Sequence, residues 1–227
     1  MKQLPRNPKL VIFDLDGTLV DAYHAITESI NFMLKKIGYP VQCHRTVKRS
    51  VGWGVDSLVK CFVPENKAVE ALAIFRAHHD NRLRQNIWLL SGARTLLPFL
   101  KKRGCLLAIA SNRPTKFCHI ILKALGIDHY FDFVICGDAV PRAKPYPDMI
   151  KVILKKSGIR PSEAVYVGDM SVDILCGQRA GVYAVGVPTG SCTRQELIAA
   201  KPDRMIKRLT QVRDFFDRGA VLKRRRI

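Results

Sequence analysis

Five short apolar runs recur along the chain, and they restrict its fold more than any other feature of the sequence. None alternates polar with apolar residues, as a strand with one solvent-exposed face would, so we expect strands that are buried on both faces of a parallel sheet. The runs are rich in β-branched residues and cover 10–13, 105–110, 133–136, 164–167 and 183–187.

Segments with helical periodicity separate these runs, and a glycine follows each segment closely, as expected where a helix ends. Strands that alternate with helices favour a three-layer, Rossmann-like α/β fold with a parallel sheet and right-handed crossovers. The predicted helices of this core cover 93–102, 117–125, 149–156 and 171–180.

The connection between the first and second runs is too long for a single crossover. It shows helical patterning at 25–36, 56–61 and 67–84 but no convincing strand. We therefore predict an α/β core domain formed by 1–19 and 89–227, and an inserted helical cap domain at 20–88.

The chain of 227 residues is strongly basic, with 38 Lys and Arg against 19 Asp and Glu and a net charge of +19. Its last 27 residues end in KRRRI. No nucleic-acid-binding motif or aromatic interleaving accompanies this charge, so we expect a solvated basic surface and no specific nucleic-acid partner. No apolar run is long enough to cross a bilayer, and the N-terminus lacks a signal-peptide pattern. We expect a cytoplasmic protein without a membrane partner, either a monomer or a homodimer.

Polar residues follow each of the first four predicted strands. Ligands of open parallel sheets bind at the carboxyl ends of the strands, so these residues are expected to share one edge of the sheet. They are Asp14 and Asp16, then Ser111 and Asn112, then Lys144 in a proline-rich loop, and finally Asp169 and Asp173.

The first pair lies in the sequence DLDGT. Residues two apart in a strand point to the same side, roughly 6.5 to 7 Å apart. Asp14 could then face a reacting centre while Asp16 reaches an attacking or leaving oxygen, and Gly17 allows the backbone to turn toward an anion. The alternative is that Asp16 or Thr18 only caps a helix.

A carboxylate at Asp169 beside Asp14 would form an oxygen site suited to Mg²⁺, which takes few protein ligands and keeps several waters. Asp173 could support the ion, or it could only complement a helix N-terminus. Ser111 and Asn112 would offer a hydroxyl and backbone N–H groups to a phosphate, and Lys144 would neutralise its charge. Ser111 alone could equally be a helix cap.

The motifs DLDGT, Ser111, Lys144 and GDMSVD, in this order, resemble those of the haloacid dehalogenase superfamily over nearly the whole chain. The resemblance implies that Asp14 is the nucleophile and Asp16 the general acid and base. It implies that Mg²⁺ is held by Asp14, the backbone carbonyl of Asp16 and Asp169, with support from Asp173. We assign phosphate binding to four residues: Thr18, Ser111, Asn112 and Lys144.

The predicted cap resembles that of phosphoglycolate phosphatase-like members, because SVGWGVDSLV is similar to their Val-Gly-x-Gly segment. This resemblance implies that Gly52, Trp53 and Gly54 contribute to substrate specificity, although Trp53 could instead pack inside the cap. We expect a Mg²⁺-dependent phosphomonoester hydrolase that acts on a small phosphorylated metabolite through an aspartyl-phosphate. Pyrophosphatase, nucleotidase and sugar phosphomutase activities stay open, and a non-enzymatic nucleic-acid-associated protein is the alternative from another class.

Overall fold

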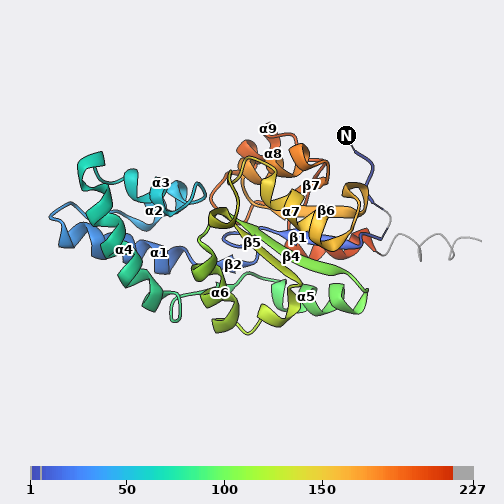
Figure 1. Cartoon of the computed structure of the whole chain (residues 1–227), viewed down its shortest axis with the longest axis horizontal. Coiled ribbons are helices and arrows are strands. Elements are labelled where there is room, and N and C mark those ends of the chain that lie inside the picture. The colour runs from blue at the N-terminus through green and yellow to red at the C-terminus, as the bar shows by residue number, and fades with distance from the viewer. Residues whose placement is uncertain (1, 6, 217–227) are drawn as a thin grey trace, which may run out of the picture.

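A six-stranded parallel sheet forms the centre of the protein, in a computed structural model that describes residues 2–5 and 7–216 (Figure 1). Its strand order is β5-β4-β1-β6-β7-β8, so β1 lies between β4 and β6 in the middle of the sheet. The strands are β1 (Leu10–Phe13), β4 (Leu106–Ser111), β5 (Phe133–Cys136), β6 (Ala164–Gly168), β7 (Tyr183–Gly186) and β8 (Arg204–Met205).

Helices cover both faces of this sheet, which confirms the predicted three-layer α/β fold. Leu10 and Ile12 of β1 pack in the cluster that includes α7 (Asp148–Ser157) and α8 (Ser171–Ala180). Val11 and Phe13 belong to the opposite cluster. That cluster includes the helices α5 (Ala93–Lys102), α6 (Thr115–Ala124) and η5 (Leu209–Phe215). Alternate residues of β1 thus face two apolar layers, which explains why the strand is apolar throughout.

We call residues 20–88 the cap segment; in Figure 1 its helices lie to one side of the sheet. Two short strands bound it, β2 (Val20–Asp21) and β3 (Trp88–Leu89), and they pair antiparallel with each other. Between them lie α1 (Tyr23–Lys36), α2 (His44–Ser50), α3 (Val55–Lys60), η1 (Glu65–Lys67) and α4 (Ala68–Arg82).

The sequence analysis did not predict β2, β3, β8, α2, α9 (Arg194–Ala199) or η5, nor the single turns η2 (Asp128–Tyr130), η3 (Gly137–Ala139) and η4 (Pro161–Glu163). The three missed strands are two residues long, too short to show any periodicity. Helix α2 buries only Val47, so it carries no apolar stripe. The expectation that 20–88 holds no strand was therefore wrong at its two ends. The division of the chain into two domains stays a prediction.

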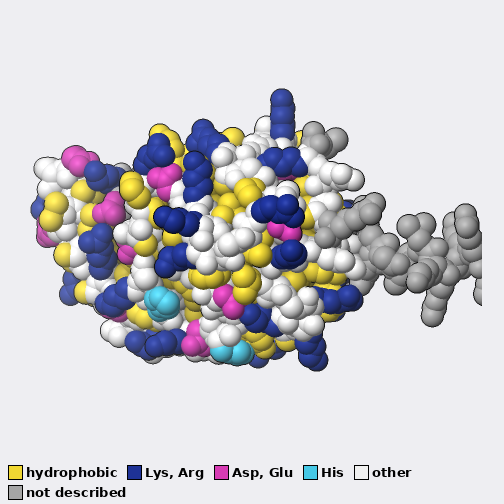
Figure 2. Space-filling model, turned by 45° about the vertical axis from the view of Figure 1, so that its right-hand side comes forward, with side chains coloured by type: hydrophobic (Ala, Val, Ile, Leu, Met, Phe, Trp, Pro, Cys, Tyr) yellow, Lys and Arg dark blue, Asp and Glu magenta, His cyan; other side chains and the backbone are white. Residues whose placement is uncertain are grey.

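Lys and Arg side chains are spread over the face shown in Figure 2 rather than gathered in one patch. The basic tail lies, from residue 217 onward, outside the described residues. Among the helices of the described part of the chain, none has both the length and the apolar character that a membrane crossing requires.

Candidate active site

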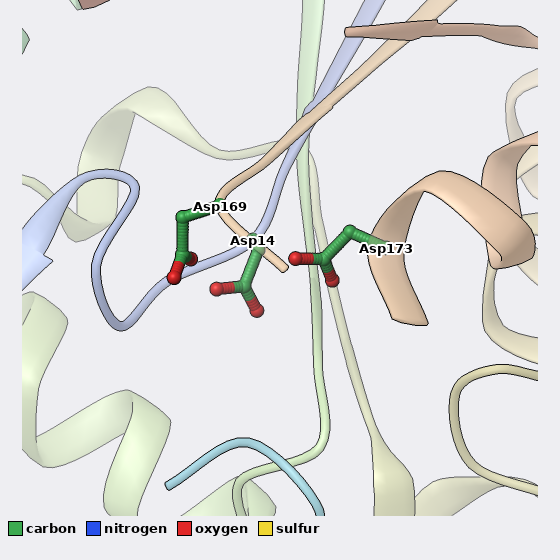
Figure 3. A group of neighbouring side chains, drawn as sticks. All are labelled: Asp14, Asp169 and Asp173. Atoms are coloured by element: carbon green, nitrogen blue, oxygen red, sulfur yellow. The ribbon is translucent and has the colours of Figure 1, made fainter. Parts of the chain in front are cut away.

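Three aspartates gather at the carboxyl ends of two neighbouring central strands. Asp14 follows β1, Asp169 follows β6, and Asp173 lies in the first turn of α8. One carboxylate oxygen of each lies within 4.8 Å of the others, and all three side chains are buried. Figure 3 shows the three carboxylates turned toward a common region. The parallel pairing of β1 with β6 brings residues more than 150 positions apart to this edge of the sheet.

Lys144 places its ammonium group inside this cluster. Its Nζ donates to Asp14 Oδ1 at 2.6 Å and to Asp173 Oδ1 at 2.7 Å. Burial alone would lower the pKa of Lys144, but the two carboxylates outweigh burial and raise this pKa overall. Lys144 is therefore a charged ammonium group that compensates part of the negative charge of the cluster.

One ammonium group does not balance three buried carboxylates. Burial, offset in part by Lys144, raises the pKa of Asp14 to about 7. Burial and then the charge of Asp14 raise the pKa of Asp169 well above its usual value. Both shifts show that ionising these buried carboxylates is costly, and carboxylate oxygens are hard ligands of the kind that divalent cations prefer. The residues therefore fit a divalent metal ion.

Asp169 is held from two sides. Thr18 Oγ1 donates to Asp169 Oδ1 at 3.0 Å, and the Ser191 backbone N–H donates to Asp169 Oδ2 at 2.9 Å. Gly190 lies so close that a Cβ there would come within 1.8 Å of Asp169 Oδ2. The hydroxyl of Thr18 is thus directed to Asp169, and Thr18 is absent from the residues that line the cavity described below. Its role in phosphate binding stays a prediction.

Both carboxylate oxygens of Asp173 are hydrogen-bonded, one of them as the helix-capping alternative predicts, and its support of a metal ion stays a prediction. Its Oδ2 accepts the Met170 backbone N–H at 2.9 Å, as a residue at the start of a helix does. Its Oδ1 faces the cluster, where it accepts from Lys144 and, at 2.9 Å, from the hydroxyl of Tyr166. The same hydroxyl lies 3.2 Å from Lys144 Nζ. Tyr166, in the middle of β6, was not among the predicted site residues.

A cavity of about 50 Å³ lies next to these groups. Asp14, Asp16, Ser111, Asn112 and Lys144 are the predicted site residues that line it from the sheet edge. The remaining lining residues, apart from Arg113 and Met170, belong to the cap segment: Ile26, Val51, Gly52, Gly54, Val55, Leu58, Phe75 and His79.

Asn112 connects the cavity to two other segments. Its side-chain N–H group donates to the Gly52 carbonyl at 2.9 Å and to the Lys144 carbonyl at 3.2 Å, and its Oδ1 accepts the Lys144 backbone N–H at 2.8 Å. Ser111 is buried, and its Oγ accepts the backbone N–H of Arg113 at 3.3 Å. Asn112 thus positions the Lys144 loop and the Gly52 turn against each other.

The predicted specificity residues of the cap segment differ in their positions. Gly52 and Gly54 line the cavity, with backbone φ angles of 130° and 90° that favour glycine. Trp53 does not line it and is 55% exposed, so it does not pack inside the cap segment either. Its part in substrate specificity stays a prediction.

Asp16 is paired with a residue to which the sequence analysis gave no role. Arg113 donates from Nε to Asp16 Oδ2 at 2.7 Å and from Nη2 to Asp16 Oδ1 at 2.8 Å. The third contact of this guanidinium joins Nη1 to Nε2 of His79, 3.0 Å away in α4 of the cap segment. The one feature of the sequence that could have identified Arg113 as a site residue is its position directly after Ser111 and Asn112. His79 gave only a weak signal, as one of two adjacent histidines, His78 and His79, in a predicted helix.

Comparisons with known proteins agree with this geometry. The family model for haloacid dehalogenase-like hydrolases matches residues 11–187. The chain is 30% identical to phosphoglycolate phosphatase 1 of Pseudomonas aeruginosa strain PAO1, over 95% of this chain and 82% of that protein. It is 28% identical to the phosphoglycolate phosphatase of Nitrosococcus oceani, over 95% of this chain and 99% of that one.

Solved structures resemble it equally well. A crystal structure described as a predicted phosphoglycolate phosphatase from Haemophilus somnus 129PT superposes with a TM-score of 0.86 and 29% sequence identity. The match covers 92% of this chain and 97% of that one. On this evidence the chain belongs to the haloacid dehalogenase-like hydrolase family.

Proposed function

We propose that the protein is a Mg²⁺-dependent phosphomonoester hydrolase whose substrates are small phosphorylated acids of the phosphoglycolate type. The observation that carries this proposal is the position of Asp14, which follows the central strand β1 and lines a cavity beside Lys144 and two further carboxylates. The names of the relatives support the substrate, since those proteins are phosphoglycolate phosphatases.

In the proposed reaction, a carboxylate oxygen of Asp14 attacks phosphorus in line with the ester oxygen. The bond from phosphorus to the ester oxygen breaks, and Asp16 gives a proton to the departing alkoxide. Asp16 then removes a proton from a water that attacks the aspartyl-phosphate, which releases inorganic phosphate and restores Asp14. Lys144, already in contact with Asp14, would neutralise charge on the phosphoryl oxygens.

Asp14, Asp169 and the backbone carbonyl of Asp16 would hold the metal ion, with Asp173 in support. Bound there, Mg²⁺ would supply the positive charge that the carboxylates lack and that a phosphoryl group needs on transfer. Ser111, Asn112 and Thr18 are proposed to contribute the remaining contacts to phosphate. The cap segment, which supplies most of the apolar cavity wall, would keep bulk water away from the aspartyl-phosphate.

Release of inorganic phosphate tests this proposal. The purified protein would be assayed with phosphoglycolate, sugar phosphates, nucleotides, pyrophosphate and an aryl phosphate, each with Mg²⁺ and with a chelator. We expect Mg²⁺-dependent turnover with phosphoglycolate among the best substrates, and at least a thousandfold loss in Asp14→Asn. The exposed Asp128 provides a matched control, Asp128→Asn, which should retain full activity.

Full activity in Asp14→Asn would contradict the proposed nucleophile. Absence of turnover with every phosphate ester would contradict the hydrolase reaction itself. A clear preference for pyrophosphate, nucleotides or a sugar phosphate would keep the reaction and replace the proposed substrate.

We also propose that the protein acts in the cytoplasm, as a monomer or a homodimer. The location is supported by its seven cysteines, all of which are free thiols in the structure, as is usual in a reducing compartment.

A further inference from the structure

Arg113 is the feature of the cavity wall that the proposed reaction leaves without a role. Its side chain is only 5% exposed, and it lines the cavity together with Lys144. Burial would lower the pKa of this guanidinium, but Asp16 outweighs burial and raises it further, so the group is always charged. A buried, charged arginine of this kind needs an anionic partner, and here that partner is a carboxylate.

The cap segment fixes the orientation of Arg113 through His79. Ser29 Oγ donates to the Ala25 carbonyl at 2.8 Å, so this oxygen accepts from Nδ1–H of His79 at 2.9 Å. The proton on Nδ1 leaves Nε2 as the acceptor for Nη1–H of Arg113. Burial, and then the charge of Arg113, hold the pKa of His79 well below its usual value, which keeps the ring neutral.

Nη1 of the guanidinium is therefore hydrogen-bonded to His79, and the Nε–Nη2 edge is directed at a planar carboxylate. The two hydrogen bonds of that edge, at 2.7 and 2.8 Å, have the bidentate geometry by which arginine selects carboxylates. At present the carboxylate of Asp16 occupies this edge. Arg113 and Asp16 both line the cavity, so a ligand in the cavity lies next to this pair.

The apolar part of the wall from the cap segment offers no partner to an anion. Apart from His79 and two glycines, the wall from this segment is apolar, and a charge buried against such a surface without a partner is costly. The residues that form this apolar wall are Ile26, Val51, Val55, Leu58 and Phe75. Among the described residues that line the cavity, Lys144 and Arg113 are the only cations, and Lys144 is committed to the cluster around Asp14.

We propose that Arg113 determines specificity by binding the carboxylate of the substrate through its Nε–Nη2 edge, and that His79 is the positioning residue that aims this edge. This inference rests on the proposed hydrolase function and adds to it the residue that recognises the carboxylate of the phosphorylated acid. When the substrate binds, its carboxylate replaces that of Asp16 at the Nε–Nη2 edge of Arg113. Asp16 is then free to face the ester oxygen.

The test compares two substrates that differ only in charge at the far end: phosphoglycolate and its uncharged amide, phosphoglycolamide. In the unmodified protein we expect kcat/KM to be at least about 30-fold higher for the acid, the usual scale for a buried charge-assisted pair. In Arg113→Met this preference should fall to near onefold, whatever happens to the absolute rates. Arg113→Lys keeps the positive charge but loses the bidentate guanidinium geometry, so it should retain an intermediate preference for the acid.

A purely structural role for Arg113, in which it only orients Asp16, would lower kcat/KM for both substrates by the same factor and leave the preference unchanged. That result would overturn the inference. Equal kcat/KM for the acid and the amide in the unmodified protein would also overturn the inference, and this measurement does not depend on the folding of any variant. The hydrolase function would not be affected by that result. No turnover of either ester would instead count against the hydrolase function. The exposed Arg94 supplies the control, since Arg94→Met should alter neither rate.

His79 is tested through KM. His79→Leu removes the acceptor for Nη1, so we expect KM for phosphoglycolate to rise about tenfold while KM for the amide changes less than twofold. His79→Gln restores an acceptor oxygen and should recover most of the loss. An equal rise of KM for both substrates in His79→Leu would show that His79 supports only the fold of the cap segment, and would remove it from the proposal.

Discussion

Lys144 Nζ lies 2.6 Å from Asp14 Oδ1, although 130 residues separate the two in sequence. The same Nζ lies 2.7 Å from Asp173 Oδ1, so one ammonium group is shared by two buried carboxylates. This sharing makes Lys144 the internal counter-ion of the cluster, and its removal should affect folding as well as activity.

Replacing Lys144 by methionine should lower the free energy of unfolding by about 3 kcal/mol or more at neutral pH without metal, because two buried carboxylates lose their partner. Urea denaturation measures this change. The double variant Asp14→Asn/Lys144→Met should recover part of the loss, since it removes one of the unpaired charges. Strictly additive effects would show that the contact between Lys144 and Asp14 contributes nothing to stability.

Metal binding should be visible without any assay of activity. A ligand that binds only the folded protein stabilises it, by about 2.7 kcal/mol at a hundred times its Kd, which corresponds to roughly 5 to 10 °C in Tm for a chain of this size. We expect saturating Mg²⁺ to raise Tm by this amount in the unmodified protein and in Asp128→Asn. Asp169→Asn removes a predicted ligand and should abolish the shift. A full shift in Asp169→Asn would place the metal ion elsewhere.

The hydroxyl of Tyr166 forms hydrogen bonds with both Asp173 and Lys144. Tyr166→Phe keeps the packing of the ring but leaves these groups with one partner fewer, so we expect a loss of about 1 to 2 kcal/mol in the free energy of unfolding. Because Lys144 is then less well positioned, kcat/KM should fall about three- to tenfold. Tyr146, which is 45% exposed, gives the matched control Tyr146→Phe. Equal effects of the two substitutions would exclude a special role for Tyr166.

Arg49 joins the cap segment to the core. Its guanidinium forms a bidentate pair with Glu196 of α9, at 2.6 and 2.9 Å, and also donates to the Ser191 carbonyl. Arg49→Met should weaken closure of the cap segment over the cavity. Since the pair is exposed to solvent, we expect only a two- to fivefold rise in KM for phosphoglycolate. A KM that is unchanged at low salt would show that this pair does not hold the cap segment closed.

The same pair predicts a pH dependence. Hydrogen bonds from Arg49, and then from the Thr193 backbone, lower the pKa of Glu196 to about 2. A lowered carboxyl pKa means that the contact is complete above the ordinary value of 4.5 and is lost as the pH falls toward 2. NMR titration should find the Glu196 midpoint near 2, and closer to 4.5 in Arg49→Met. Glu163, whose pKa is also lowered to about 2 but by Arg160 and Lys9, should not respond to this substitution.

Much of the fold could be predicted because its determinants are local. The strands β1 and β5 have the predicted bounds, and so do the helices α5 and α8. Each is an uninterrupted apolar or periodic run with a clear end. The strands β2, β3 and β8 depend instead on pairing with distant segments, and a strand of two residues is too short for its sequence to predict such a pairing.

The residues of the candidate site also differ in whether local sequence patterns were enough to predict them. Asp14, Asp169 and Lys144 follow strands, so the rule for parallel sheets was enough to bring them together. The pairing of Arg113 with Asp16 spans 97 residues, and its contact with His79 depends on how the cap segment packs on the core. In the sequence, Tyr166 is indistinguishable from the other buried residues of its strand. The direction of its hydroxyl group depends on neighbouring residues that the sequence does not identify.

The pairing of β2 with β3 has a consequence for how such a protein can change over evolutionary time. Val20 pairs with Leu89, so the chain leaves the core and returns to it at one place. The core is therefore connected to everything in between through two adjacent strands, and the entropy of closing a loop grows only slowly with its length. Insertions, deletions or wholesale replacement between these points can reshape the substrate chamber while the sheet that carries the chemistry stays intact.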